Sequence, residues 1–183
     1  KEEKPEITFA DVKEADWYYN DVMELSKLGI LSGDGSGNFA PNDNVTREQF
    51  LKMIIEAASI ETDNAENTFE DVKSDAWYVN YVLTAKKLGI VNGVSDTEFG
   101  IGTNITRQDM AVMIARAIAD LDITNNKTDA FADEDKVSDY AKSSVNLMKS
   151  IGLIEGYNNE YRPLDNLTRA EASKVISELL EIL

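Results

Sequence analysis

The sequence predicts an all-α protein in which three helix-loop-helix repeats form a pseudo-threefold arrangement around a shared central helix bundle. Three observations lead to this prediction. One sequence unit occurs three times, apolar residues in each unit recur at helical spacing, and each unit ends in a helix that begins with the same capping motif. A two-helix unit leaves apolar stripes exposed, so the three units are expected to bury their stripes against one another.

Composition and charge exclude several function classes. The chain has 183 residues, 43% of them hydrophobic, and its 18 basic against 34 acidic residues give a net charge of -16. Such a chain is not expected to bind nucleic acid or anionic lipid non-specifically. It contains no Cys and no His, which removes thiolate chemistry, the commonest general base and the commonest metal ligand. We therefore expect no enzymatic activity, no cofactor and no metal site.

The sequence shows neither a membrane span nor a secretion signal. It has no run of about 18 apolar residues, which a membrane-spanning helix needs. Residues 1–4 are polar and carry no signal peptide. The sequence is thus expected to be either cytoplasmic or a mature or excised part of a secreted protein.

The repeat is defined by landmarks that recur in the same order: a Phe-x-Asp opening, an aromatic residue, an apolar-Gly-apolar triplet, a second glycine, a further aromatic residue and an arginine. The openings start at Phe9, Phe69 and Phe131, the second glycines are Gly33, Gly93 and Gly156, and the arginines are Arg47, Arg107 and Arg169. The arginines are 60 and 62 residues apart. We place the repeats at residues 1–60, 61–123 and 124–183.

The first helix of each unit is predicted from an apolar stripe. Apolar residues lie five, eight and eleven positions after the first aromatic residue, on one face of a 3.6-residue helix. They are Val22, Leu25 and Leu28; Val82, Ala85 and Leu88; and Val145, Met148 and Ile151. The glycine of the triplet follows each stripe, where a left-handed residue would end the helix, at Gly29, Gly89 and Gly152.

The second helix is predicted to begin behind a threonine N-cap, at Thr46, Thr106 and Thr168. Gln49 and Glu171 complete a capping box, of which Asp109 is a shorter version. The apolar stripe behind each cap includes an isoleucine seven residues after the arginine, and these residues are expected to pack at the centre: Ile54, Ile114 and Ile176. The polar links at residues 61–67 and 122–128 are expected to be exposed.

Three of the five arginines occupy the position directly after the N-cap threonine. A cation there opposes the helix dipole, at a cost of a few tenths of a kcal/mol up to about 1. The guanidinium of Arg47, Arg107 or Arg169, together with free backbone N–H groups of the helix end, would suit a carboxylate or phosphate. The alternative is an ion pair with an acid of a neighbouring repeat, and the residues alone leave both open.

Two short motifs carry a family resemblance. Residues 168–171 read Thr-Arg-Ala-Glu, and residues 39–41 and 161–163 read Phe-Ala-Pro and Tyr-Arg-Pro. Combined with the Phe-x-Asp openings and the Leu-Gly-Ile triplets, they resemble the S-layer homology family across three complete repeats. The resemblance implies a three-pronged spindle.

The resemblance also implies a non-covalent cell-wall anchor, extracellular, on a bacterial cell wall or S-layer. Such triplets bind secondary cell-wall polysaccharide carrying pyruvate ketals, in grooves between repeats where the motif arginine meets the pyruvyl carboxylate. Arg47, Arg107 and Arg169 are then the leading ligand-binding residues. The alternative is a protein-interaction or assembly module of a bacterial surface layer, which contacts other copies of a surface-layer protein and has purely structural arginines.

Departures from the family pattern predict unequal grooves. Glu48 stands beside Arg47 where the family favours Ala, and its carboxylate is expected to compete with a ligand. The second repeat has Gln108 and the shorter Asp109, and the third has Tyr140 where the others have Trp. The arginine of the third repeat, whose motif matches throughout, is expected to contribute most.

The first aromatic residue of each repeat is interpreted either as a core residue or as a groove wall on which a sugar stacks. The resemblance makes these residues secondary ligand-binding candidates: Trp17, Trp77 and Tyr140. The second glycine of each repeat, also a site candidate, is expected to permit a left-handed turn or the close approach of a sugar.

Two acidic features are predicted to be structural. The aspartates of the Phe-x-Asp openings are interpreted as turn or cap residues and not as catalytic acids. They are Asp11, Asp71 and Asp133. The loop at residues 34–38 begins like a calcium loop but has Phe39 and Val45 where that loop needs glycine and glutamate, so it is predicted to be a glycine turn.

Overall fold

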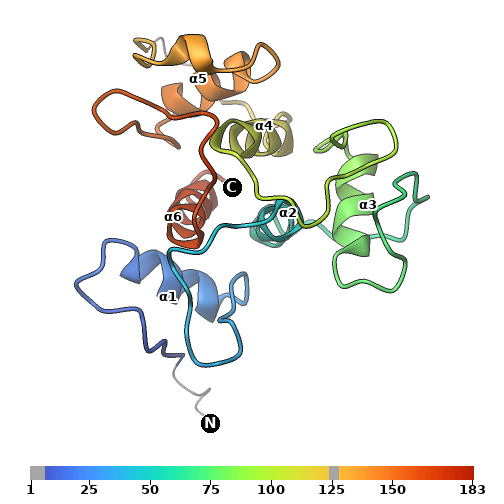
Figure 1. The fold of residues 1–183 in the computed structure, drawn as a ribbon, viewed down its shortest axis with the longest axis horizontal. Coiled ribbons are helices and arrows are strands. Elements are labelled where there is room, and N and C mark those ends of the chain that lie inside the picture. The colour runs from blue at the N-terminus through green and yellow to red at the C-terminus, as the bar shows by residue number, and fades with distance from the viewer. Residues whose placement is uncertain (1–6, 124–127) are drawn as a thin grey trace.

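The structure, a computed structural model, describes residues 7–123 and 128–183. These residues form six α-helices and no β-strand, so the predicted all-α class is confirmed (Figure 1). The helices are α1 (Tyr19–Lys27), α2 (Arg47–Ala57), α3 (Val79–Lys87), α4 (Arg107–Ala117), α5 (Lys142–Ser150) and α6 (Arg169–Leu180), with a short 3₁₀ helix, η1 (Glu134–Lys136), before α5. None of the described helices is long and apolar enough to cross a membrane.

The two links differ in how far the structure describes them. Residues 61–67 are irregular and mostly exposed, which confirms the prediction for the first link. Residues 124–127 of the second link, and the polar start at residues 1–4, lie outside the described residues.

The first helix of each repeat, α1, α3 or α5, is followed by glycine as predicted. Gly29, Gly89 and Gly152 have φ angles of +79°, +75° and +78°, the conformation of a left-handed helix end. The first two stripe positions of each helix are buried. The third position was predicted wrongly in the first two repeats, where Leu28 and Leu88 are 59% and 54% exposed, whereas Ile151 is partly buried against the core. The two leucines are C-cap residues, and the apolar residue after each glycine is buried in their place.

Each second helix, α2, α4 or α6, begins at its arginine behind the predicted threonine N-cap. In α6 the capping box is complete: Glu171 N–H donates to Thr168 Oγ1 (3.2 Å), and Thr168 N–H donates to Glu171 Oε2 (3.0 Å). In α2, Gln49 Oε1 accepts from Thr46 N–H (3.1 Å). In α4 the N–H of Asp109 donates to the N-cap hydroxyl (3.3 Å), whereas its carboxylate contacts the preceding repeat.

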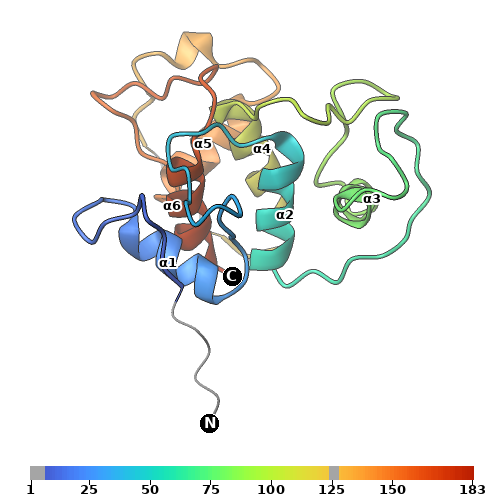
Figure 2. The ribbon, with the colours of Figure 1, turned by 60° about the horizontal axis from the view of Figure 1, so that its bottom comes forward.

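The main helix pairs are shared between repeats. Each first helix packs against the second helix of the preceding repeat, so that α3 contacts α2, α5 contacts α4, and α1 contacts α6. Figure 1 shows α2, α4 and α6 near the middle of the view and the other three helices further out. In the turned view of Figure 2, α1 and α6 still lie side by side. The first helix of the first repeat therefore covers the second helix of the third repeat.

One hydrophobic core joins the three repeats. Ile54, Ile114 and Ile176 are fully buried and belong to one contiguous cluster, which confirms the predicted shared core. At its centre, α2 contacts both α4 and α6. A smaller, separate cluster around Phe39 belongs to the first repeat. A pseudo-threefold relation among the repeats stays a prediction.

Three backbone hydrogen bonds form a ring between the repeats, just ahead of the second helices. Val45 N–H donates to the carbonyl of Leu167 (2.9 Å), Leu167 N–H to that of Ile105 (3.0 Å), and Ile105 N–H to that of Val45 (2.9 Å). Each repeat thus contributes one donor and one acceptor. The first and third repeats, although far apart in sequence, are joined in the same way as sequence neighbours.

Candidate functional site

The three motif arginines share one anchoring contact with the next repeat around the ring. Each donates from Nε to the carbonyl of an aromatic residue, and its guanidinium lies over the ring of that residue. The pairs are Arg47 with Phe99 (3.2 Å to the carbonyl, 5.3 Å to the ring centroid), Arg107 with Tyr161 (2.8 and 5.1 Å) and Arg169 with Phe39 (2.7 and 4.5 Å). The side chains are therefore held in fixed orientations.

The remaining guanidinium contacts divide the arginines into two kinds. Arg47 Nη1 pairs with Asp109 Oδ2 (3.1 Å), and Arg107 Nη1 pairs with Glu171 Oε1 (2.9 Å). Arg169 Nη2 donates to the carbonyl of Ser32 (2.8 Å), and in the described part of the chain Arg169 forms no ion pair. The position of Asp109 and Glu171 is occupied in the first repeat by a neutral residue, Gln49.

The helix ends themselves are not available to an anion, so that part of the prediction is wrong. The backbone N–H groups of the three arginines donate to the carbonyls of residues 103, 165 and 43, at 2.9, 2.9 and 2.8 Å. In α4 and α6 the next N–H groups donate to the carbonyls of Pro163 and Pro41. Backbone carbonyls of the neighbouring repeat accept from these donors because the helix starts are docked against that repeat. Only the guanidinium groups are left to meet a ligand.

Three pockets of the described chain contain one motif arginine each, and we name them after it. Each pocket has an arginine from one repeat, the second glycine from the next repeat and the first aromatic residue from the remaining one. The sets are Arg169, Gly33 and Trp77 in a pocket of about 610 Å³; Arg47, Gly93 and Tyr140 in one of about 420 Å³; and Arg107, Gly156 and Trp17 in one of about 190 Å³. The structure thus brings all nine predicted site residues together, three to a groove.

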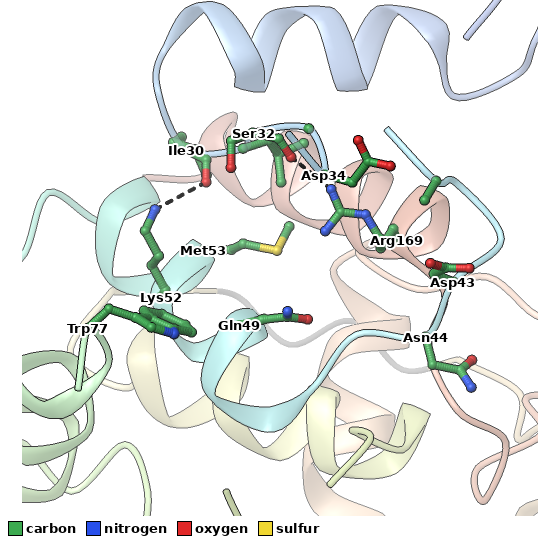
Figure 3. Close-up of a pocket in the computed structure, with 13 residues that line it drawn as sticks. Ile30, Ser32, Asp34, Asp43, Asn44, Gln49, Lys52, Met53, Trp77 and Arg169 are labelled. Atoms are coloured by element: carbon green, nitrogen blue, oxygen red, sulfur yellow. Dashed lines mark hydrogen bonds between the residues drawn. The ribbon is translucent and has the colours of Figure 1, made fainter. Parts of the chain in front are cut away.

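The Arg169 groove is the largest of the three and holds two cations. Figure 3 shows Arg169 on one side, Lys52 and Trp77 on the other, and Gln49 between them. Lys52 forms a long contact of 3.9 Å with Glu56 outside the groove. The repeat pattern does not identify Lys52 as a site residue, because the matching positions of the other two repeats hold Val112 and Lys174.

Two cations, Arg169 and Lys52, and two acids, Asp34 and Asp43, line the Arg169 groove. Burial lowers the pKa of the Arg169 guanidinium, and the carboxylates of Asp43 and Asp34 act in the opposite direction from a distance. Arginine remains protonated at any physiological pH. A partly desolvated cation therefore faces an open pocket with its charge only partly compensated.

The Arg47 groove contains a closed polar network. Asp109 accepts from Arg47 through Oδ2 and from the Tyr140 hydroxyl through Oδ1 (2.7 Å). Gln108 donates to the same hydroxyl (3.0 Å) and also contacts Ser138. Burial, followed by the hydrogen bond to Asp109, raises the pKa of Tyr140 to about 12. The three departures at positions 108, 109 and 140 thus meet in one hydrogen-bond network, of which Asp109 and Tyr140 line the groove.

The Arg107 groove is the smallest and the richest in acids. Glu171 accepts from Arg107 and lies 4.0 Å from Arg162. Lys174, which corresponds to Lys52 in position, pairs with Glu178 at 2.7 Å. The cations that line this groove are therefore largely neutralised by acids of the same chain.

The core interpretation of the repeated aromatic residues is wrong. Trp17, Trp77 and Tyr140 are 60%, 54% and 58% exposed. The two indoles make T-shaped contacts with the following tyrosines, at 5.2 and 5.4 Å between ring centroids, and more than half of each indole residue stays exposed. Exposed flat rings of this kind are available for stacking.

The second glycines owe their identity mainly to close packing. Gly93 has a φ of +95°, but Gly33 and Gly156 do not have a left-handed conformation, so the turn prediction is wrong for those two. A Cβ at Gly33 would lie 2.8 Å from the ring of Phe9 and 2.6 Å from the carbonyl of residue 38, and the other two positions are equally crowded. These glycines let the turn pack on the Phe of the repeat opening.

The repeated aspartates cap the turn before each second helix, as predicted. Asp11 accepts from the N–H groups of Phe39 and Ala40, both at 2.7 Å, and the other two aspartates accept from the equivalent groups. Burial by itself would raise the pKa of Asp71 and Asp133, but these hydrogen bonds outweigh it and lower both pKa values. They are ionised structural acceptors.

The loop at residues 34–38 is a glycine turn, as predicted. Gly35 and Gly37 have φ angles of +86° and +93°. The carboxylate of Asp34 accepts from the N–H of Ser36 (2.7 Å) and from its hydroxyl. Among the described residues, no group of three or more acidic side chains is arranged to hold a metal ion.

Comparison with known families identifies the same domain three times along the chain. Residues 8–51, 68–111 and 130–173 each match the S-layer homology domain. Together these matches cover well over half of the chain.

Comparison with individual proteins identifies long relatives. The chain is 32% identical to an endoglucanase of Bacillus sp. (strain KSM-635), over 94% of this chain and 18% of the relative. It is 33% identical to an amylopullulanase of Thermoanaerobacterium thermosulfurigenes, over 95% and 10%, and 30% identical to the surface-layer 125 kDa protein of Lysinibacillus sphaericus, over 87% and 14%. It spans less than a fifth of each. The chain belongs to the S-layer homology domain family and is a cell-wall-associated module that anchors surface proteins.

Proposed function

We propose that the chain anchors its parent protein by binding secondary cell-wall polysaccharide that carries pyruvate ketals, in the grooves between repeats. The observation that supports this most strongly is the Arg169 groove. There a guanidinium without an ion pair in the described residues faces a pocket of about 610 Å³, with Lys52 and an exposed Trp77 across from it.

A pyruvate ketal matches the chemistry of this groove. Its carboxylate is a planar anion that a guanidinium binds through charge-assisted hydrogen bonds. The sugar ring that bears the ketal presents C–H groups that suit the exposed indole face of Trp77. Lys52 offers a second cationic donor to a hydroxyl or a neighbouring carboxylate.

The acidity of the chain restricts how such a ligand binds. A polyanion is repelled by a net charge of -16, so the attraction must come from local cations. Attraction at so few points is short-ranged and screened by salt. Recognition by a groove is thus favoured over diffuse electrostatic adsorption.

We propose that the module itself is not an enzyme. Each groove contains an arginine, an aromatic residue and a glycine turn, and the sequence has no His or Cys to serve as a general base or nucleophile. The names of the enzyme relatives describe proteins of which this module matches less than a fifth. Their activities are accordingly assigned to parts outside the matched segment.

The proposal is tested by co-sedimentation of the chain with purified cell walls before and after the polysaccharide is stripped, followed by titration with pyruvylated and chemically depyruvylated polysaccharide. We expect binding to be lost on stripping and on removal of the ketal. Binding that survives stripping would favour the alternative, an assembly module that contacts other copies of a surface-layer protein. Binding that is lost on stripping but survives depyruvylation would mean that the chain binds the polysaccharide without contacting the pyruvyl carboxylate.

A further inference from the structure

We propose that the third residue of each second helix decides whether the arginine of the preceding repeat is open to ligand. These residues are Gln49, Asp109 and Glu171. Asp109 pairs with Arg47 and Glu171 pairs with Arg107. The neutral Gln49 leaves Arg169 open. The Arg169 groove is then the one working groove in the wild-type chain. This inference rests on the proposed function.

The two capping boxes show how one position serves two tasks. Glu171 uses Oε2 to accept from Thr168 N–H (3.0 Å) and Oε1 to accept from Arg107 (2.9 Å). Gln49 uses Oε1 to accept from Thr46 N–H (3.1 Å), as a cap requires. Its other terminal group is an amide NH₂, which is a donor and cannot accept from a guanidinium. Glutamine therefore caps the helix without occupying the arginine.

The Arg47 groove is occupied more firmly. Asp109 is too short to serve as a full capping-box partner, and its two oxygens are taken by Arg47 (3.1 Å) and Tyr140 (2.7 Å). Gln108 holds the same tyrosine from the other side. A ligand that binds Arg47 would have to displace a carboxylate that is already in place and tied to a second partner.

An internal carboxylate is a strong competitor because it is covalently attached. Its effective concentration is that of an intramolecular group, in the millimolar range or above, whereas the ligand must be drawn from solution. The Arg47 side chain is only 9% exposed and the Arg107 side chain 11%, so these pairs are poorly screened. The Arg169 groove is lined by Gln49, by a second cation, Lys52, and by two carboxylates, Asp34 and Asp43, neither of which forms an ion pair with Arg169 in the described residues.

The test is an exchange of the two boxes in the whole chain. Gln49→Glu makes the first box match the third, so the helix cap is retained while a carboxylate is placed across from Arg169. Glu171→Gln does the reverse for Arg107. The matched control is Asn64→Asp, which adds one negative charge at an exposed position of the first link, outside the three grooves. The probe is a short saccharide with a single pyruvate ketal at its non-reducing end, titrated by calorimetry.

We expect the wild type to bind one probe per chain. Gln49→Glu should lower the affinity at least about thirtyfold, as loss of a charge-paired contact does, whereas Asn64→Asp should stay within about twofold of the wild type. Glu171→Gln should add a second, weaker site. Wild-type affinity in Gln49→Glu, or a wild-type stoichiometry of two or three, would overturn the inference.

A ligand-free measurement separates this inference from the proposed function. Nuclear magnetic resonance of the arginine side chains reports how fast each guanidinium rotates and exchanges its protons, and an ion pair slows both. In Gln49→Glu the Arg169 signals should slow to the level of Arg107. If the wild type fails to bind the probe, the proposed function is wrong and this measurement still decides the pairing. If the Arg169 signals do not change, the pairing is wrong even where the polysaccharide binds.

Discussion

The Arg169 groove and the Arg47 groove are built from the same motif but differ in what their arginine contacts. Both guanidinium groups are fixed by a carbonyl and an aromatic ring of the next repeat. Arg169 then faces an open pocket with Lys52, whereas Arg47 is paired with Asp109 in a network that includes Tyr140. Under the proposed function, the same motif serves as a ligand site in one groove and as a joint between repeats in the other.

The deciding residue lies in a different repeat from the arginine it affects. Arg169 is governed by Gln49, and Arg47 by Asp109, because each second helix ends its first turn opposite the arginine of the previous repeat. The two grooves should therefore respond in opposite ways to the same kind of mutation. The predictions below use that contrast.

The largest expected effect is on ligand affinity. Arg169→Ala should weaken binding of a short, singly pyruvylated saccharide by about 2 to 5 kcal/mol, because the ligand carboxylate loses its charged partner. Arg47→Ala should cause a clearly smaller loss. Calorimetry on variants shown by circular dichroism to be folded measures both. Equal losses, or a loss confined to Arg47→Ala, would remove the distinction between the grooves.

The next effect is on the free energy of unfolding, and here Arg47→Ala should have a larger effect than Arg169→Ala. Arg47→Ala breaks a poorly exposed ion pair and leaves Asp109 without its cation, so the free energy of unfolding should fall by about 3 kcal/mol. Arg169→Ala loses hydrogen bonds to carbonyls and should cost about 1 kcal/mol. Urea unfolding of both variants gives the comparison. A greater loss for Arg169→Ala would contradict the joint role of Arg47.

A third contrast concerns the aromatic wall. Trp77→Ala should weaken binding of the same saccharide by about 1 kcal/mol, since a stacking surface is removed from the working groove. Leu88→Ala is the control, because this leucine is equally exposed but lies outside the three grooves. The idea fails if both variants bind like the wild type.

The smallest expected effect is the change in stability with pH that accompanies the titration of Tyr140. Its pKa is raised to about 12, against an ordinary value of about 10, so the neutral hydroxyl is the favoured form. The stability that it contributes is present below pH 10 and is lost as the pH rises toward 12. The phenolate absorbance of the wild type minus that of Tyr140→Phe should show this pKa, and Asp109→Asn should move it toward 10. An unshifted titration would mean that the network is not formed.

The parts of the fold that were predictable depend on local sequence. The helix starts follow from threonine caps, the helix ends from glycines such as Gly29, and the shared core from isoleucines such as Ile114 at matched positions. Each signal acts within a few residues or repeats three times, so it can be read without knowing the docking of the repeats. The failure at Leu28 shows the limit, because a helical pattern does not reveal where the chain leaves the helix axis.

The contacts between repeats were harder to predict. Glu48 was expected to compete for Arg47 because it is adjacent in sequence, yet its carboxylate accepts from the N–H of Gly102 (3.1 and 3.2 Å), and the competitor is Asp109. Adjacent residues on a helix point in different directions, and the true partner lies 62 residues away. The signal was present in the sequence, since Gln49, Asp109 and Glu171 differ in charge, but Gln49 and Glu171 were interpreted only as capping residues.

The ring through Val45, Ile105 and Leu167 also bears on the order of folding. The contacts of α3 with α2 and of α5 with α4 join neighbouring segments, whereas Arg169 reaches Phe39 across 130 residues. The entropy lost on closing a loop grows with its length, so we expect the first and third repeats to meet last. The Arg169 groove lies at that final junction. Under the proposed function, a truncated chain that lacks the first or the third repeat would therefore lack this attachment point, and only a completely folded module would be retained at the wall.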